Sequence, residues 1–290
     1  MGREALYTVT GPRLIVEMTS PEVRELINLT TTVVMSVGSI EQHGPHLPLF
    51  TDYYQADDLI RRTVLALEGR GILVAGGFVL PLGPAEDGMA FAGTVSIRTE
   101  TFLMTLNDVL ESLYRHGFRY IPIILHHEQN MGPCMAAVRE FNARHVDAVA
   151  GVLAGWFQAG VVAQRHEIGR GSRSSEDGHA GEFETSRMLA TRPELVQLNK
   201  SGVHYPPSRR RIPHDEYPLA GGGLYRPLHD YASVAPDGYI GAASLATPEV
   251  GEQMYSRAVD WICDVIQRDF VAAPKQPSGQ REPLETKRHS

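Results

Sequence analysis

Short apolar runs rich in β-branched residues alternate with longer amphipathic stretches along most of the chain. The strand-like runs lie at residues 32–37, 72–75, 78–80, 120–125 and 148–153. The stretches with apolar residues at helical spacing lie at 53–68, 99–116, 133–145 and 248–268. Repeated strand–helix alternation predicts an α/β fold with a mostly parallel central sheet that helices cover on both faces.

Local signals refine this pattern. Gly76 and Gly77 predict an interruption between the runs at 72–75 and 78–80. Pro122 lacks a backbone N–H, which predicts either an edge position for the 120–125 strand or a place in its first part. Thr247 before a proline predicts a helix start with threonine as the N-cap.

The composition is that of a globular protein, and the length suggests one large domain or two small ones. We expect one α/β domain over residues 1–270, and the polar, charged, proline-containing stretch 271–290 predicts a disordered tail. Residues 201–241 are rich in Pro, Gly, Tyr and His, which predicts long ordered loops near a site or a subunit contact. Cys134 and Cys263 sit among apolar neighbours, so we interpret them as core residues rather than as a disulfide or a thiolate site.

Charge and hydropathy bear on partners and location. The net charge is −7, and the one basic cluster, at 208–211, is short and flanked by prolines. We therefore expect no binding to nucleic acid or to an anionic membrane. No apolar run approaches the length of a membrane span, and the first residues do not resemble a signal peptide, so we expect a cytoplasmic protein.

Candidate metal ligands follow the first predicted strand. Glu41 and His43 lie two positions apart in a proline-rich turn, and Asp52 arrives at the start of the next helix. In a doubly wound sheet, ligands bind beyond the carboxyl ends of the strands. Carboxylates mixed with imidazoles suit Zn, Mn or Fe(II). The spacing alone fits equally well a polar turn in which Asp52 caps the helix.

Two further polar clusters share this ligand chemistry. Leu125-His-His-Glu-Gln-Asn130 follows the third predicted strand, and Ser175–Ser186 contains His179 and four acids before a helical stretch. Each cluster alone is a weak signal. Together with the turn at Glu41 they predict a site assembled at one edge of the sheet.

The residues of these clusters resemble a family. Glu-Gln-His-Gly-Pro-His-Leu-Pro-Leu-Phe-Thr-Asp at 41–52 resembles the signature of the creatininase family, the creatinine amidohydrolases and their relatives. His-Ala-Gly-Glu-Phe-Glu-Thr-Ser at 179–186 resembles its second signature. Further similar segments lie at 91–97, 237–241 and 244–247, so the resemblance runs in order over most of the chain.

The resemblance implies a three-layer α/β sandwich, a homo-oligomer that is a hexamer in several members, and two divalent metal ions. Carried over residue by residue, Glu41, Asp52 and His127 hold one ion, and His43 and Asp52 hold the second, with Asp52 bridging. His179 is implied as a proton-transfer group near the substrate. Glu184 is a second catalytic candidate, and Glu128 and Glu176 are candidates for substrate binding.

Some positions depart from the family pattern. Leu125-His126-His127 stands where the family has Asn-Gly-His, Gln129 replaces a glutamate ligand, and Ser175 replaces a tryptophan. The neutral Gln129 predicts a weaker second ion, or one that recruits Glu182 or Glu128. Because the aromatic side chain expected at Ser175 is absent, we do not expect creatinine itself to be the substrate.

The implied function is metal-dependent hydrolysis of a linear or cyclic amide, with a metal-activated water as the nucleophile and a small molecule as the substrate. Two alternatives stay open. One is a specialised biosynthetic amidase or deformylase of the same family. The other is a non-catalytic binding subunit that metal ions stabilise.

Overall fold

The computed structural model describes residues 11–160, 165–171, 173, 176–206 and 230–271. Twelve helices and strands carry the architecture, joined by short 3-10 turns and loops. Their bounds are α1 Ser20–Leu29, β1 Val33–Val37, α2 Thr51–Gly69, β2 Ala75–Leu80, α3 Thr99–His116, β3 Tyr120–Leu125, α4 Met131–Arg144, β4 Val149–Leu153, α5 Gly155–Gly160, α6 Arg165–Ile168, α7 Glu182–Thr191 and α8 Pro248–Asp269.

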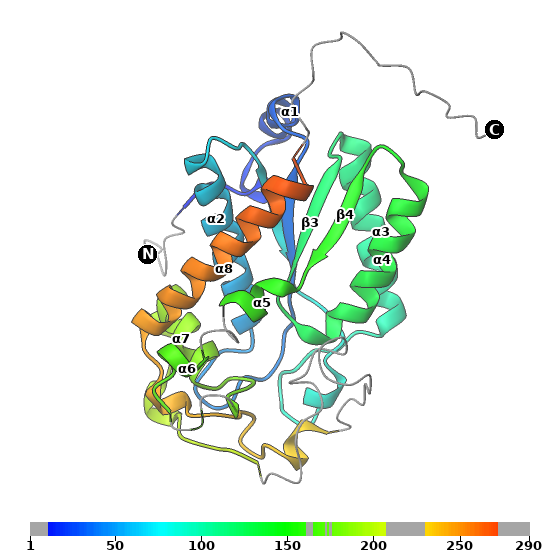
Figure 1. Cartoon of the computed structure of the whole chain (residues 1–290). Helices are drawn as coiled ribbons and strands as arrows, with labels where there is room; N and C mark the ends of the chain where they lie inside the picture. Colours follow the sequence, from blue (N-terminus) through cyan, green and yellow to red (C-terminus); the bar gives the residue numbers. More distant parts are fainter. Residues whose placement is uncertain (1–10, 161–164, 172, 174–175, 207–229, 272–290) are drawn as a thin grey trace, which may run out of the picture.

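The four strands of the described residues form one sheet in the order β2-β1-β3-β4. All three neighbouring pairs are parallel. Figure 1 shows the strands pointing the same way, so their carboxyl ends meet at one edge of the sheet. The predicted parallel α/β sheet is confirmed, and it creates the edge at which ligand-binding loops gather.

Helices cover both faces of the sheet, because successive side chains of a strand point to opposite sides. Val34 of β1 packs into the core beneath α2 and α8, whereas Val33 and Met35 pack into the core beneath α3 and α4. Figure 1 shows these two helix layers on either side of the strands. The three-layer sandwich is therefore confirmed.

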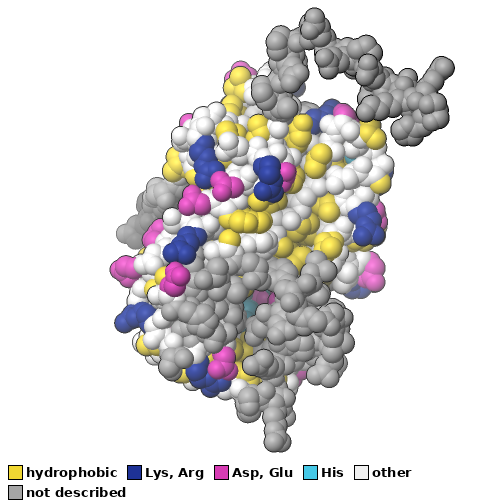
Figure 2. All heavy atoms as spheres, viewed as in Figure 1, with side chains coloured by type: hydrophobic (Ala, Val, Ile, Leu, Met, Phe, Trp, Pro, Cys, Tyr) yellow, Lys and Arg dark blue, Asp and Glu magenta, His cyan; other side chains and the backbone are white. Residues whose placement is uncertain are grey.

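The helix boundaries follow the predicted signals closely. Thr247 accepts a hydrogen bond from the N–H of Val250 at the start of α8. Gly117 ends α3 in the left-handed region, at φ 117°. On the surface, Arg62 of α2 pairs with Glu252 of α8, and Figure 2 shows basic and acidic side chains interspersed over this face. Among the described residues, no helix is both long and apolar enough to cross a membrane.

The two local predictions have different outcomes. β2 is one strand through Gly76 and Gly77, so the predicted break is wrong, although its pairing with β1 shifts register between Gly76 and Val79. Only glycine fits at position 77, because a Cβ there would lie 2.7 Å from the carbonyl oxygen of Val34. Of the two places predicted for Pro122, the edge is wrong and the first part of the strand is confirmed, since β3 is an inner strand whose register with β1 begins at Ile123. Of the loops expected over 201–241 and the tail expected over 271–290, residues 207–229 and 272–290 lie outside the described residues.

Gly77→Ala is expected to lower the free energy of unfolding by about 1–3 kcal/mol, because the added methyl group overpacks the β1–β2 pair. Gly132→Ala is the matched control: Gly132 lies in α4, and a Cβ there would meet nothing within 4 Å. That control is expected to raise the free energy of unfolding by about 0.4–1 kcal/mol. Urea denaturation measures both changes, and equal effects of the two variants would contradict the close approach at Gly77.

Candidate metal centre

Loops and helix starts at the carboxyl edge of the sheet supply the candidate residues. Glu41 and His43 lie in the loop after β1, and Asp52 lies in the first turn of α2. This loop is held rigid by backbone hydrogen bonds from the N–H of Glu41 to the carbonyl of Leu49 and from the N–H of Val95 to the carbonyl of Ile40. His127 follows β3 directly, and His179 and Glu184 flank the start of α7.

The first group of ligands, the Glu41 group, consists of Glu41, Asp52 and His127, all buried. His127 Nδ1 lies 3.2 Å from Glu41 Oε2 and 3.3 Å from Asp52 Oδ2. His127 Nε2 donates to the carbonyl oxygen of Pro84 at 2.7 Å, since a carbonyl can only accept. In the neutral ring, that contact fixes the tautomer and leaves the Nδ1 lone pair facing the acids.

The second group, the His43 group, consists of His43, His179 and Glu184. His43 Nε2 lies 3.7 Å from Glu184 Oε2, and the rings of His43 and His179 are 4.3 Å apart. His43 Nδ1 donates to the carbonyl oxygen of Glu41 at 3.0 Å. As for His127, a hydrogen bond from the other ring nitrogen to a backbone carbonyl orients the ring of His43. This leaves Nε2 of His43 free for a metal ion.

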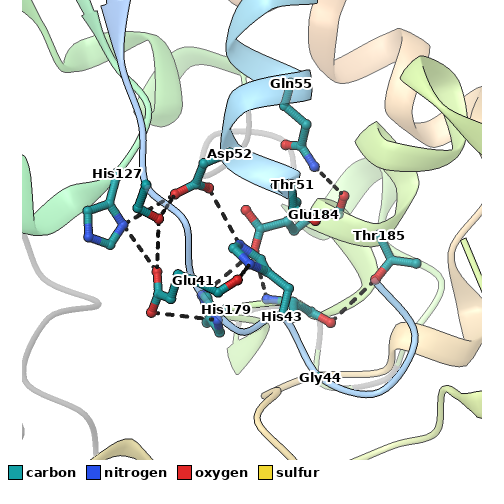
Figure 3. Close-up of polar contacts among 12 residues, drawn as sticks. Glu41, His43, Gly44, Thr51, Asp52, Gln55, His127, His179, Glu184 and Thr185 are labelled. Atoms are coloured by element: carbon teal, nitrogen blue, oxygen red, sulfur yellow. Dashed lines mark hydrogen bonds and ion pairs between the residues drawn. The ribbon is translucent and has the colours of Figure 1, made fainter. Parts of the chain in front are cut away.

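Asp52 lies between the two groups (Figure 3). Its Oδ2 faces His127, and its Oδ1 lies 3.5 Å from His43 Nε2. Ser39 Oγ donates to Oδ2 at 2.7 Å and holds the carboxylate in this orientation. A single aspartate therefore presents one oxygen to each group, which is the arrangement of a carboxylate that bridges two ions.

The start of α7 positions Glu184 and His179. Glu184 Oε2 accepts the N–H of Ala180 at 2.7 Å, and Ala180 adopts φ 51°, a conformation that residues other than glycine rarely take. Arg187 donates to the other oxygen of Glu184 at 3.3 Å. His46 links the loop that carries Glu41 to this segment, since its Nε2 lies 3.1 Å from the carbonyl oxygen of Ala180.

Mutual charges set the protonation of the centre. Burial raises the pKa of Glu41, but nearby imidazoles, His179 foremost, outweigh it and lower the pKa to about 2. Burial lowers the pKa of His43, but the carboxylates of Glu184 and Asp52 raise it to about 9. Burial also lowers the pKa of His127, but the carboxylates of Glu41 and Asp52 raise it well above its usual value. The acids are thus ionised over the physiological range, ready to bind a cation.

The donor atoms fit divalent metal ions. Two donors bound to one tetrahedral ion at about 2.0–2.1 Å are roughly 3.3 Å apart. Within the Glu41 group the two contacts to His127 Nδ1 measure 3.2 and 3.3 Å. His43 Nε2 lies 3.7 Å from Glu184 Oε2, within the His43 group, and 3.5 Å from Asp52 Oδ1. Mixed carboxylate and imidazole donors suit Zn, Mn or Fe(II).

Three of the residues predicted from sequence lie outside both groups. The Glu182 carboxylate is buried and accepts the N–H groups of Arg170 and Gly171, so we do not retain it as a ligand. Glu176 is exposed and pairs with Arg173. Glu128 is also exposed, at the 3-10 turn after β3.

Gln129 and His126 are two further polar residues that follow β3. The Gln129 side-chain amide donates to Asp87, so this neutral residue is engaged outside the two groups. No role was assigned to His126 from the sequence. Its side chain is buried, and its Nδ1 lies 3.5 Å from Asp52 Oδ1. The signal in the sequence was the pair of adjacent histidines; which of the two faces the acids depends on the strand's exit geometry.

Known proteins share this architecture. A model of the creatininase family, described as creatinine amidohydrolase, matches residues 16–266. The chain is 30% identical over 234 residues to a mycofactocin precursor peptide peptidase of Mycobacterium ulcerans (strain Agy99), which covers 79% of this chain and 82% of the relative. It is 28% identical over 247 residues to the creatinine amidohydrolase of Pseudomonas putida, covering 82% and 89% respectively.

Solved structures agree. A crystal structure of creatinine amidohydrolase (creatininase) matches with a TM-score of 0.69 at 28% identity, over 90% of this chain and 98% of that chain. Two further creatininase structures, named as a manganese form and as a zinc–zinc type of a mutant, match with TM-scores of 0.69 and 0.68, each at 27% identity over 89% of this chain and 98% of theirs. The family model spans most of the chain, and the expected resemblance is confirmed: this protein belongs to the creatininase family.

Proposed function

We propose that this protein hydrolyses an amide C–N bond at a centre of two divalent metal ions. The observation that carries the proposal is Asp52, whose two oxygens face different ligand groups. Glu41 and His127 would hold one ion together with Asp52, and His43 would hold the other, also with Asp52. Two ions held by these residues would lower the pKa of a water molecule and polarise the carbonyl oxygen of the substrate.

His179 and Glu184 are proposed to transfer protons to the leaving nitrogen. His179 Nε2 donates to the carbonyl oxygen of Gln42 at 2.7 Å, which leaves Nδ1 as the nitrogen that takes up and releases a proton. Nδ1 lies 3.9 Å from Glu184 Oε2, which the N–H of Ala180 holds in place. A carboxylate beside an imidazole orients the ring.

The substrate is proposed to be a small linear or cyclic amide other than creatinine. The named relatives support two readings: a creatinine amidohydrolase opens a cyclic amide, and a precursor peptide peptidase cleaves a peptide. The identity to the peptidase is as high as 30%, which keeps a specialised biosynthetic amidase as the second candidate. Assaying metal-loaded protein on lactams, N-formyl compounds and short peptides separates them, and activity on creatinine alone would contradict both the proposed substrate class and its runner-up.

The identity of the metal ions and the oligomeric state are also part of the proposal. Zn, Mn and Fe(II) all suit the donors, and solved creatininases include zinc and manganese forms. Reconstitution with each ion, followed by metal analysis, decides among them. We propose that the protein assembles as a homohexamer. We also propose that it is cytoplasmic. Native mass measurement tests the assembly.

Metal binding near pH 7 is expected to release about two protons per molecule, because metal-bound imidazoles must be neutral. Without metal, His43 and His127 are both protonated there, since the pKa of His43 is raised to about 9 and that of His127 well above its usual value. Fewer protons should be released once the pH exceeds about 9. Calorimetric titration in buffers of different ionisation enthalpy measures the release.

The same pKa shifts fix the sign of a stability effect. The contacts between imidazolium and carboxylate stabilise the metal-free fold fully below pH 6.5, the usual pKa of histidine. This stabilisation is lost as the pH rises through about 9. A binding enthalpy that does not depend on the buffer, or a metal-free protein that gains stability over that range, would contradict the assignment of charges.

A further inference from the structure

His126 has a buried imidazole with no hydrogen bond to any residue that the structure describes. Its side chain is 1% exposed, and both Nδ1 and Nε2 lack a hydrogen-bond partner within those described segments. The nearest charged atom to Nδ1 is Asp52 Oδ1, at 3.5 Å. An unpaired polar atom in the interior is unfavourable, so a native protein typically retains such a group where an ion, a water molecule or another ligand satisfies it.

Packing explains the ring of His126 but not its nitrogens. The ring stacks on Trp156 with centroids 5.3 Å apart and planes at 25°. Trp156 is itself fixed, because its indole N–H donates to the carbonyl oxygen of Leu125 at 2.7 Å. A phenylalanine would supply the same stacking without placing two unpaired nitrogens in the interior. The imidazole is therefore suited to a polar partner at the edge that faces Asp52.

The side of Asp52 that His126 faces is the side of the second ion. Oδ1 lies 3.5 Å from both His126 Nδ1 and His43 Nε2. Each of these two separations is close to the roughly 3.3 Å between donors of one tetrahedral ion, so two imidazoles flank a single carboxylate oxygen. Gln129, which stands where the family pattern has a glutamate ligand, is directed to Asp87 and offers no donor here.

We propose that His126 is a ligand of the ion that Asp52 Oδ1 and His43 hold. The inference rests on the proposed function, because it requires the centre to bind two ions. Its consequence is a second site with two imidazole donors and one carboxylate. Such a donor set favours Zn over Mn, whereas the Glu41 group, richer in oxygen, tolerates both ions.

His126→Phe tests this role, since it keeps the stacking on Trp156 and removes both nitrogens. Titration of metal-free protein with Zn²⁺, followed by calorimetry, is expected to show two ions bound by the parent and one site weakened by at least about 100-fold in the variant, because even residues that only orient a ligand cost 10–100-fold. His126→Asn, which is smaller and polar, provides a second variant if the first does not fold.

Cobalt substitution supplies a second readout that does not depend on activity. With Co²⁺ bound, each imidazole ligand that keeps an N–H gives an exchangeable, strongly shifted proton resonance, and the variant should lack one of these. His116→Phe, at an exposed histidine at the end of α3, is the matched control and should bind both ions as the parent does. A His126→Phe protein that binds two Zn²⁺ ions with unchanged affinity overturns the inference alone. A parent protein that binds no ion overturns the proposed function as well.

Discussion

Asp52→Ala is expected to remove both metal ions and to lower turnover by at least about 10³-fold, because several kcal/mol of charge stabilisation are lost and each 1.4 kcal/mol is tenfold in rate. The reason is geometric. Oδ1 faces His43 and Oδ2 faces His127, so one substitution removes a donor from each ligand group. His127→Ala should differ, since it removes a donor from the Glu41 group alone.

Metal content and initial rates measured on the same preparations check this prediction. We expect close to two ions in the parent, close to one in His127→Ala and less than one in Asp52→Ala when excess metal is removed. Asp108→Ala, at an exposed acid of α3, controls for the loss of a carboxylate and should match the parent. An Asp52→Ala protein that retains two ions would show that the two groups do not share this residue.

His179→Ala is expected to keep both ions while turnover falls by about 10²–10⁴-fold, the usual contribution of a positioned acid or base. The structure allows a second reading, because His179 also lies with His43 and Glu184 within one group of possible ligands. The two readings predict different metal contents. A proton-transfer group leaves the stoichiometry intact, whereas a ligand takes one ion with it.

The pH dependence of the residual activity gives a further distinction. Loss of an acid or base removes one limb of the pH–rate profile, whereas loss of an ion lowers the rate over the whole range. His116→Ala, at an exposed histidine, provides the control. A His179→Ala protein with parental turnover would remove His179 from the mechanism. A parent protein that holds two ions but turns over none of the amides tested would favour the metal-stabilised binding subunit.

The fold and most of the centre were readable from the chain because both depend on local pattern. Buried parallel strands need continuous apolar runs, and amphipathic helices need a helical period, so β1, β3, β4 and α3 appeared within a few residues of their observed bounds. Glu41, His43 and Asp52 were candidates because they follow a buried strand in a stiff turn, and the resemblance to the creatininase family, rather than the spacing, favoured them as ligands. The positions at which strands end dictate where such a site lies.

Only the tertiary structure decided contacts between segments distant in sequence. Nothing local distinguishes Glu182, which accepts two backbone N–H groups, from Glu184, which faces the histidines, although both begin the same helix. Likewise, the need for glycine at position 77 comes from the neighbouring strand, because a Cβ there would lie 2.7 Å from the carbonyl oxygen of Val34. His126 acquired its setting from Trp156 and Asp52. Periodicity fixes which face a side chain takes, whereas its partners depend on how separate elements pack, and that information is spread over the whole chain.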